Sequence, residues 1–195
     1  MSKHPKEERT FVMVKPDGVM KGLTGEIIKR IEQRGLKIVA LEMFQPTKQQ
    51  IDEHYPKNEE WVHRLGDKTL NTYAKFGYDA IKELGTDKRE EIGPMVREWL
   101  VNYMVSAPLV KMVVQGAHAV SVTRKLMGET MPVDAAIGTV RGDFSSESPA
   151  LANKEKRAVM NLVHVSETAE EAEHEIEHWF APEQIHAYKR LEDHL

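Results

Sequence analysis

The chain has 195 residues, of which 41% are hydrophobic and 30% charged, a composition typical of a globular protein with a full core. Its net charge of −4 argues against a general nucleic-acid-binding protein, and the lack of cysteine excludes disulfides, thiol nucleophiles and cysteine-bound zinc. Residues 1–8 lack the apolar centre of a signal peptide, and no apolar run could span a membrane. We therefore expect one domain over residues 1–195 in a cytoplasmic protein, with no membrane or specific nucleic-acid partner.

The first part of the chain predicts two strands, each followed by a helix. Residues 11–14 form an apolar strand that ends in a turn at Lys15-Pro16-Asp17-Gly18. Thr24 is expected to cap the next helix, whose buried stripe is Ile27, Ile28 and Ile31. Residues 36–44 alternate as a second strand, and a short helix follows from Thr47 to Tyr55.

Two long segments are harder to interpret. Residues 56–93 are polar with scattered apolar anchors, a spacing that favours helical hairpins over disorder. Pro94 fits the first turn of a helix that runs to about Val105. Residues 131–158 are rich in proline and glycine and are expected to be mostly loop.

The remaining elements complete an α+β pattern. Val and Met dominate a central strand at 109–115, and a helix at 117–127 carries Arg124 and ends at Gly128. Residues 159–165 form the last strand, a capping box at Thr168 opens the final main helix, and Pro182 begins a tail helix. This order predicts a ferredoxin-like α/β sandwich, a four-stranded antiparallel sheet with surrounding helices.

His164 is the first candidate for chemistry because it lies at the end of the last strand, just before a helix. Imidazole is largely neutral at pH 7 and nucleophilic enough to carry a phosphoryl group. A histidine packed in the core is the competing interpretation. Glu175 borders the apolar stripe of the helix that follows, and a carboxylate there needs a partner such as the imidazole N–H. A partly exposed glutamate on an acidic helix is the alternative.

Cations are available for the oxygens of a phosphoryl group. Lys15 ends the first strand, Arg124 precedes Thr130, and Arg141 lies in a glycine-flanked loop. The planar fork of arginine can bind two oxygens at once, although each of these charges has an ordinary surface explanation. His174 and His178 have a spacing that can bind zinc, but no third ligand is evident. The chain has neither a P-loop nor a Rossmann glycine motif.

Taken together, several motifs resemble those of the nucleoside diphosphate kinase family. They run in order from residue 9 to about 190: Thr10–Val19 with its Lys-Pro-Asp-Gly, Gly25–Ile28, His54-Tyr55, Met127–Thr130, Gly138–Phe144, Asn161–His164 and Trp179–Glu183. The combination is highly specific, although single pieces such as Lys-Pro-Asp-Gly are not.

The resemblance implies a ping-pong reaction in which His164 takes the γ-phosphoryl group of a nucleoside triphosphate, such as ATP, and passes it to a nucleoside diphosphate. It implies that Arg124 and Thr130 hold the distal diphosphate, Arg141 stabilises the transferred group, and Lys15 and Asn161 bind the sugar, with Lys15 also near the phosphates. Tyr55 would lie beside the histidine, and Glu175 would orient it. Mg²⁺ would arrive with the nucleotide, with Glu167 reaching it through water. The resemblance also implies a homo-oligomer, a hexamer or a tetramer.

The chain departs from the family pattern at several positions. Val165 replaces a glycine, Glu167 replaces an aspartate, and Val96 falls where an aromatic side chain stacks on the base, with Trp99 three residues on. The segments 56–93 and 145–159 are longer than usual. These departures motivate a second hypothesis, a nucleotide-binding regulatory protein that transfers phosphate poorly. A phosphohistidine relay to another protein is a third.

Overall fold

The computed structural model describes residues 7–191, and within this range the strands form one antiparallel sheet in the order β2-β3-β1-β4. The strands are β1 (Arg9–Val14), β2 (Lys37–Phe44), β3 (Leu109–Gln115) and β4 (Val163–Val165). At the centre of the sheet, Val12 of β1 pairs with Met112 of β3 on one side and with Val165 of β4 on the other. The predicted ferredoxin-like α+β architecture is therefore confirmed, and β3 is an interior strand as expected.

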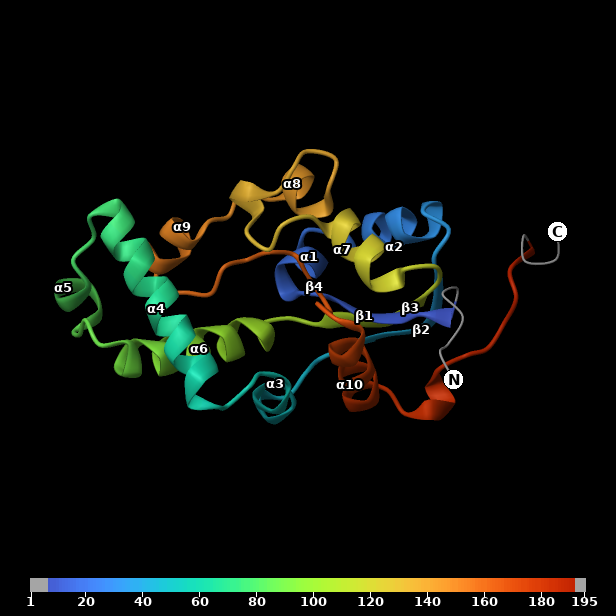
Figure 1. Cartoon of the computed structure of the whole chain (residues 1–195), viewed down its shortest axis with the longest axis horizontal. Helices are drawn as coiled ribbons and strands as arrows, with labels where there is room; N and C mark the ends of the chain where they lie inside the picture. The colour runs from blue at the N-terminus through green and yellow to red at the C-terminus, as the bar shows by residue number, and fades with distance from the viewer. Residues whose placement is uncertain (1–6, 192–195) are drawn as a thin grey trace.

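Helices cover both faces of the sheet (Figure 1). Along β1 the side chains alternate, so Phe11 and Met13 join one core cluster while Val12 and Val14 join the other. The first cluster is covered by α3 (Lys48–His54), α10 (Ala169–Trp179) and the end of α6 (Arg89–Met104). The second is covered by α2 (Thr24–Gln33) and α7 (Ala119–Met127). A strand buried on both faces cannot show the simple apolar–polar alternation, which is why β1 from Phe11 onward is a continuous apolar run and β3 is one apart from Lys111 and its last residue.

Some predicted boundaries are wrong for local reasons. The expected turn at Lys15–Gly18 is the start of a short helix, α1 (Pro16–Met20), because proline fits the first helical position. Thr24 is the first residue of α2 and caps nothing, since Leu23 precedes it without a side-chain bond. Of the predicted strand 159–165 only β4 pairs, because Leu162 has a positive φ of 68° that breaks an extended backbone.

Other corrections concern helix ends. The helix expected from Pro94 begins five residues earlier, at Arg89, so the proline lies inside α6. Thr168 caps α10 by accepting from the Glu171 N–H, but the Glu171 carboxylate accepts from the Glu167 N–H, so the reciprocal capping box is absent. The region 131–158 contains a 3₁₀ turn, Pro132–Asp134, and two short helices, α8 (Val140–Phe144) and α9 (Pro149–Lys154).

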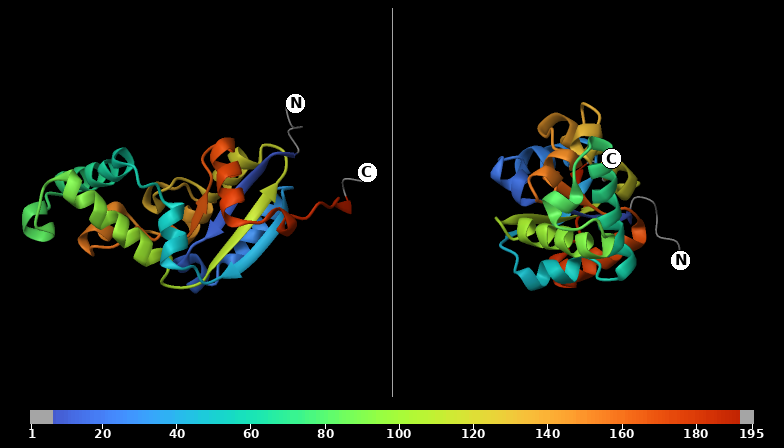
Figure 2. Two further views of the ribbon diagram at one scale, coloured as in Figure 1. Left: turned by 90° about the horizontal axis from the view of Figure 1, so that it is seen from below. Right: turned by 90° about the vertical axis from the view of Figure 1, so that its left-hand side faces the viewer.

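The segment 56–93 forms a helical arm, as predicted, and the arm extends beyond the sheet (Figure 2). It consists of α4 (Glu59–Phe76), α5 (Ala80–Leu84) and the beginning of α6. The second long segment packs against it, because the Tyr73 hydroxyl donates to the Asn153 carbonyl at 3.4 Å and Lys154 pairs with Glu83 at 2.5 Å. The two long segments therefore support each other as one unit.

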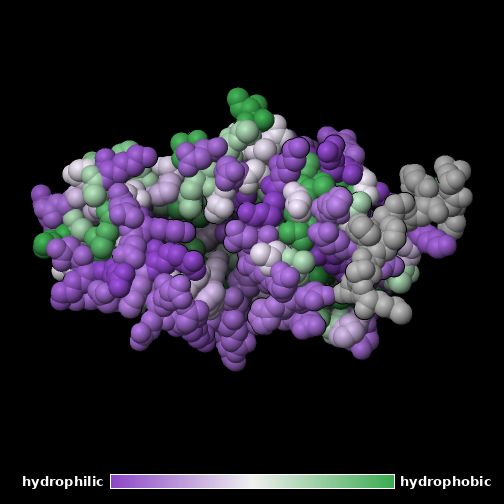
Figure 3. Space-filling model, viewed as in Figure 1, coloured by the Kyte–Doolittle hydropathy of each residue, from purple (hydrophilic) through white to green (hydrophobic). Residues whose placement is uncertain are grey.

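The surface in Figure 3 is largely hydrophilic, with hydrophobic side chains in several places, among them the far end of the arm, where Phe76 and Ile81 are exposed. At the opposite end, the predicted tail helix is only a 3₁₀ turn, Pro182–Gln184. The chain then runs along β2, where the His186 N–H donates to the Val39 carbonyl at 2.8 Å. The last residues of the predicted tail, 192–195, lie outside the described residues. No helix in the described range combines the length and apolar character of a membrane span.

Candidate active site

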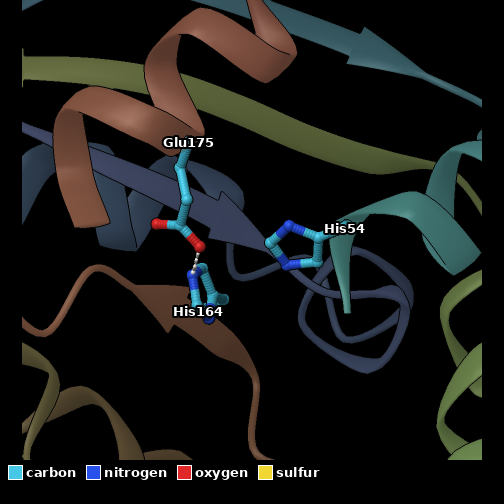
Figure 4. A group of neighbouring side chains, drawn as sticks. All are labelled: His54, His164 and Glu175. Atoms are coloured by element: carbon cyan, nitrogen blue, oxygen red, sulfur yellow. Dashed lines mark hydrogen bonds and ion pairs between the residues drawn. The ribbon is translucent and has the colours of Figure 1, made fainter. Parts of the chain in front are cut away.

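His164 lies at the middle of β4, opposite Met13 of β1, and its ring is fixed from the α10 side. Its Nε2 atom is 2.6 Å from Glu175 Oε1, as Figure 4 shows. The side chain is 22% exposed, so the ring is held by the protein and is still accessible. Because Nε2 is occupied by the carboxylate, Nδ1 is the nitrogen left free to act as a nucleophile.

Glu175 is buried, with 6% of its surface exposed, and both of its oxygens are bonded. Oε1 meets His164, and Oε2 accepts from the Ser166 hydroxyl at 2.7 Å. Burial acts to raise the pKa of Glu175, but the hydrogen bonds from His164 and Ser166 outweigh it and hold that pKa below its ordinary value. A carboxylate that stays ionised beside an imidazole keeps the proton on Nε2 and stabilises positive charge on the ring.

His54, which the sequence argument did not assign a role, lies edge-on to His164 with ring centroids 5.2 Å apart. Burial, followed by the nearby His164, lowers the pKa of His54 to about 3, so this ring stays neutral. The Trp179 indole donates to His54 Nδ1 at 3.2 Å, which places the proton of the neutral ring on Nε2. The only signal for His54 in the sequence is its place in the His54-Tyr55 pair.

The ligand atoms of His54, His164 and Glu175 lie within 4.8 Å of one another, a spacing that raises the question of a metal site (Figure 4). The hydrogen bonds of these residues argue against a bound metal ion. In His54 one nitrogen accepts from Trp179 and the other carries a proton, so neither offers a lone pair to an ion. The arrangement therefore suits a histidine kept ready for chemistry better than a metal centre.

A cavity of about 410 Å³ opens in front of His164 and is lined mainly by polar side chains. Its walls come from the ends of β1, α7, α8 and β4. The lining side chains that carry charge or hydrogen-bonding groups are Lys15, Arg124, Lys125, Glu129, Thr130, Thr139, Arg141, Asn161 and His164. Four cations against one carboxylate make the cavity an anion site within a chain of negative net charge.

Lys15 and Asn161 form the inner wall of this cavity. The Lys15 ammonium donates to Asn161 Oδ1 at 2.7 Å, and the Asn161 amide donates to the Thr130 carbonyl at 3.0 Å. Burial, with a smaller effect from Arg141, lowers the pKa of Lys15 to about 8. An anion placed between Lys15 and Arg141 would relieve the repulsion between the two cations, which favours binding of a phosphate.

Arg141 is 4% exposed and is bound largely to backbone. Its guanidinium donates to the carbonyls of Asn161 at 3.0 Å, Gly128 at 2.6 Å and Val163 at 2.6 Å. Burial and the charge of Arg124 lower the pKa of Arg141 to about 10, so it stays charged at neutral pH. Since most of its N–H groups are already used, Arg141 fixes the loop before His164, and it would offer a bound anion chiefly its positive charge.

The turn after α7 brings Arg124 and Thr130 to the same cavity. Gly128 has φ 83°, and a Cβ there would lie 2.4 Å from Thr139 Oγ1, so only glycine fits. Arg124 lies at the rim, 3.6 Å from the exposed carboxylate of Glu167. Glu167 is not among the residues that line the cavity.

Two predicted site residues lie elsewhere among the described residues. Tyr55 packs beside His54 with the two rings tilted and their centroids 5.0 Å apart, and it does not line the cavity. Burial, and then the charge of Glu175, raises the pKa of its hydroxyl above the ordinary value. Val96 is half-buried on α6 and is also outside the lining, and the neighbouring Trp99 packs against the core cluster of Phe11. The structure thus brings together the phosphate-binding candidates and His164 with Glu175, but not Val96.

The antiparallel sheet, the cationic cavity and a histidine held by a buried carboxylate define a class of protein, the phosphotransferases. A family model described as "Nucleoside diphosphate kinase" matches residues 8–64 and 90–185. The chain belongs to the nucleoside diphosphate kinase family. The residues between the two matched ranges, 65–89, fall within the arm predicted from sequence.

Individual relatives agree with this family. A nucleoside diphosphate kinase of Pyrobaculum aerophilum is 47% identical over 178 residues, covering 91% of this chain and 97% of the relative. The Pyrococcus furiosus enzyme of the same name is 36% identical, with 95% and 91% of the two chains covered. The mouse nucleoside diphosphate kinase A is 36% identical, with 93% and 91% covered.

Solved structures are similar over almost the whole chain. The NDP kinase of Pyrobaculum aerophilum superposes with a TM-score of 0.88 at 46% identity, covering 92% of this chain and 98% of that one. A Borrelia burgdorferi nucleoside-diphosphate kinase, described as a transition-state mimic with bound vanadate and ADP, gives a TM-score of 0.75 at 29% identity, with 97% and 96% covered.

Proposed function

We propose that this protein transfers the γ-phosphoryl group of a nucleoside triphosphate to a nucleoside diphosphate through a phosphohistidine on His164. The observation that carries the proposal is the position of His164 on the wall of a cationic cavity, with Nε2 tied to a buried carboxylate. The Borrelia relative is described as a transition-state mimic with bound vanadate and ADP, which supports phosphoryl transfer here.

In the first half-reaction, Nδ1 of His164 attacks the γ-phosphorus and forms a P–N bond. The bond between that phosphorus and the bridging β-phosphate oxygen breaks, and the nucleoside diphosphate leaves with the electron pair. Positive charge develops on the imidazole, and Glu175 stabilises it through Nε2. A second nucleoside diphosphate then attacks the phosphohistidine with a terminal oxygen, which restores the free histidine.

The cations of the cavity hold the phosphates during both steps. Arg124 and Thr130 are proposed to bind the distal diphosphate, and Arg141 to stabilise the transferred group by its charge. Lys15 and Asn161 are joined by a hydrogen bond. Both are proposed to bind the sugar hydroxyls, with Lys15 also close to the phosphates. Tyr55 is proposed to help fix the neighbouring His54. Val96 lies outside the cavity lining, and it is proposed to contact the base by apolar packing where the nucleotide extends beyond the phosphate-binding side chains. Because no base edge is recognised, we expect broad tolerance of the base.

The residues of the cavity fit Mg²⁺ that is bound to the phosphates of the nucleotide. A resident magnesium site needs several oxygen ligands, whereas the cavity wall has one carboxylate, Glu129, among four cations. Glu129 in the lining and, from the rim, Glu167 are the carboxylates that would reach a phosphate-bound ion through water. When bound, the ion would neutralise part of the negative charge of the phosphates.

Labelling with γ-labelled ATP and Mg²⁺, followed by a chase with GDP, tests this function. We expect label to enter the protein as an acid-labile, base-stable adduct and to leave as GTP, and His164→Gln to lose at least about a thousandfold in turnover, since it removes the nucleophile. Nucleotide binding without label would favour the regulatory binder, with Val165 as the first suspect. Label that does not pass to GDP would favour the relay.

We also propose that residues 1–195 work as one domain and that the protein assembles as a homo-oligomer. Two exposed apolar side chains in the loop between α7 and α8 support assembly, Val133 at 58% and Ile137 at 93% exposure. The cytoplasmic location stays a prediction.

A further inference from the structure

The backbone just before His164 adopts a rare conformation. Leu162 has φ 68° although it is a large, fully buried side chain. The Val163 N–H donates to the Asn161 carbonyl at 2.8 Å, so Leu162 is the central residue of a three-residue γ-turn. The positive-φ form of this turn is strained in any residue other than glycine, and such a conformation persists only where its surroundings enforce it.

The first helix supplies that enforcement from a distant part of the sequence. The Leu162 N–H donates to Asp17 Oδ2 at 3.1 Å, and the Leu162 carbonyl accepts from the Lys15 N–H at 2.9 Å. Gly18 leaves room for the turn, because a Cβ there would lie 2.6 Å from the Leu162 carbonyl oxygen. Figure 1 places α1 beside the entry to β4 accordingly.

Asp17 is itself held. Its other oxygen, Oδ1, accepts a hydrogen bond from the Tyr103 hydroxyl at the end of α6, and Asp17 and Tyr103 are 3% and 8% exposed. Burial and the adjacent Asp17 raise the pKa of the Tyr103 hydroxyl, so it remains a donor. A buried carboxylate with one oxygen on a tyrosine and the other on a backbone N–H has a fixed orientation.

The turn places the residues on its two sides into one cavity. Asn161 precedes Leu162 and His164 follows it by two residues, and both side chains line the cavity. An extended Leu162 would change the direction of the chain between them, so that the amide and the imidazole could not both face the phosphates.

We propose that Asp17, fixed by Tyr103, is a positioning residue for phosphoryl transfer that holds Leu162 in its left-handed turn and thereby aims His164 and Asn161 at the nucleotide. This inference rests on the proposed function, since it concerns the same histidine.

The test compares Asp17→Asn and Tyr103→Phe with the wild type in single-turnover phosphorylation, with thermal unfolding measured on each protein. Asp17→Asn keeps the shape but replaces one accepting oxygen by a donor. We expect the phosphorylation rate of Asp17→Asn to fall about ten- to a hundredfold, because a displaced histidine attacks less efficiently. The variant should still be folded at the assay temperature. Tyr103→Phe, which leaves the Leu162 bond in place, should lose less.

A double variant that relieves the backbone strain distinguishes an effect on the position of His164 from an effect on the stability of the protein. Glycine adopts a positive φ freely, so Leu162→Gly combined with Asp17→Asn should recover part of the lost rate, although loss of the leucine lowers the melting temperature. Asp79→Asn is the matched control, because Asp79 also accepts a backbone N–H, at 3.0 Å from Lys82, but lies on the arm. Its rate should equal that of the wild type.

A wild-type rate in Asp17→Asn, a loss explained by the unfolded fraction alone, or no recovery in the double variant would overturn the inference. Failure of the proposed function looks different, because the wild type itself would then form no phosphohistidine.

Discussion

At the scale of single residues, the charge of Lys15 is the feature most open to experiment. Its pKa of about 8 means that the free protein loses this cation as the pH rises through that value. Because the substrate is an anion, kcat/KM should be level about one pH unit or more below this pKa and fall as the pH rises through it, approaching about tenfold per pH unit above it. Bound phosphate favours the protonated amine, so kcat should change less over the same range.

The control is Lys15→Arg, which stays charged across this range and should remove the step near pH 8 even where its absolute rate is lower. A pH profile of kcat/KM for ATP in both proteins provides the measurement. A wild-type profile that stays flat to about pH 9.5 would contradict the assignment.

At the scale of elements, the arm depends on two helices that cross closely at glycines. A Cβ on Gly66 of α4 would lie 2.4 Å from the Arg89 carbonyl oxygen, and one on Gly93 of α6 would lie 2.2 Å from that of Val62. Backbone cannot yield as a flexible side chain does. Gly66→Ala should therefore destabilise the protein by about 1–2 kcal/mol despite the better helix propensity of alanine.

Gly25→Ala is the matched change, since Gly25 also lies within a helix but a Cβ there would have nothing within 4 Å. It should be neutral or stabilising by up to about 1 kcal/mol. The measurement is the urea denaturation midpoint of each variant. Equal midpoints would contradict the prediction, because they would show that α4 and α6 can move apart without loss of stability.

At the scale of the whole molecule, the property to be measured is the oligomeric state. Ile137 is 93% exposed on a loop beside the cavity, and a large apolar side chain in that position is expected to be covered by another copy. We expect sedimentation velocity to give a hexamer or tetramer, and Ile137→Asp to shift it toward smaller species. The same change at Ile81, exposed on the arm, should leave the assembly intact. A monomeric wild type would refute the proposal.

The sequence by itself determined the strands, the main helices and most members of the cavity. Strand and helix periods are local signals, and a histidine, a lysine and two arginines beside strand and helix ends were identifiable because their chemistry is carried by residue type. The arm was also predicted, since 56–93 showed helical spacing without a sheet period.

Only the tertiary structure decided how these residues act on one another. Asp17 and Leu162 are 145 residues apart, and neither the positive φ of Leu162 nor the neutral ring of His54 has a signature in nearby residues. The backbone bonds of Arg141 and the contact of Tyr73 with Asn153 likewise join distant segments. Periodicity reports which face of an element is apolar. Hydrogen-bond partners, strain and pKa shifts depend on which segments pack together, and that is settled only when the whole chain folds.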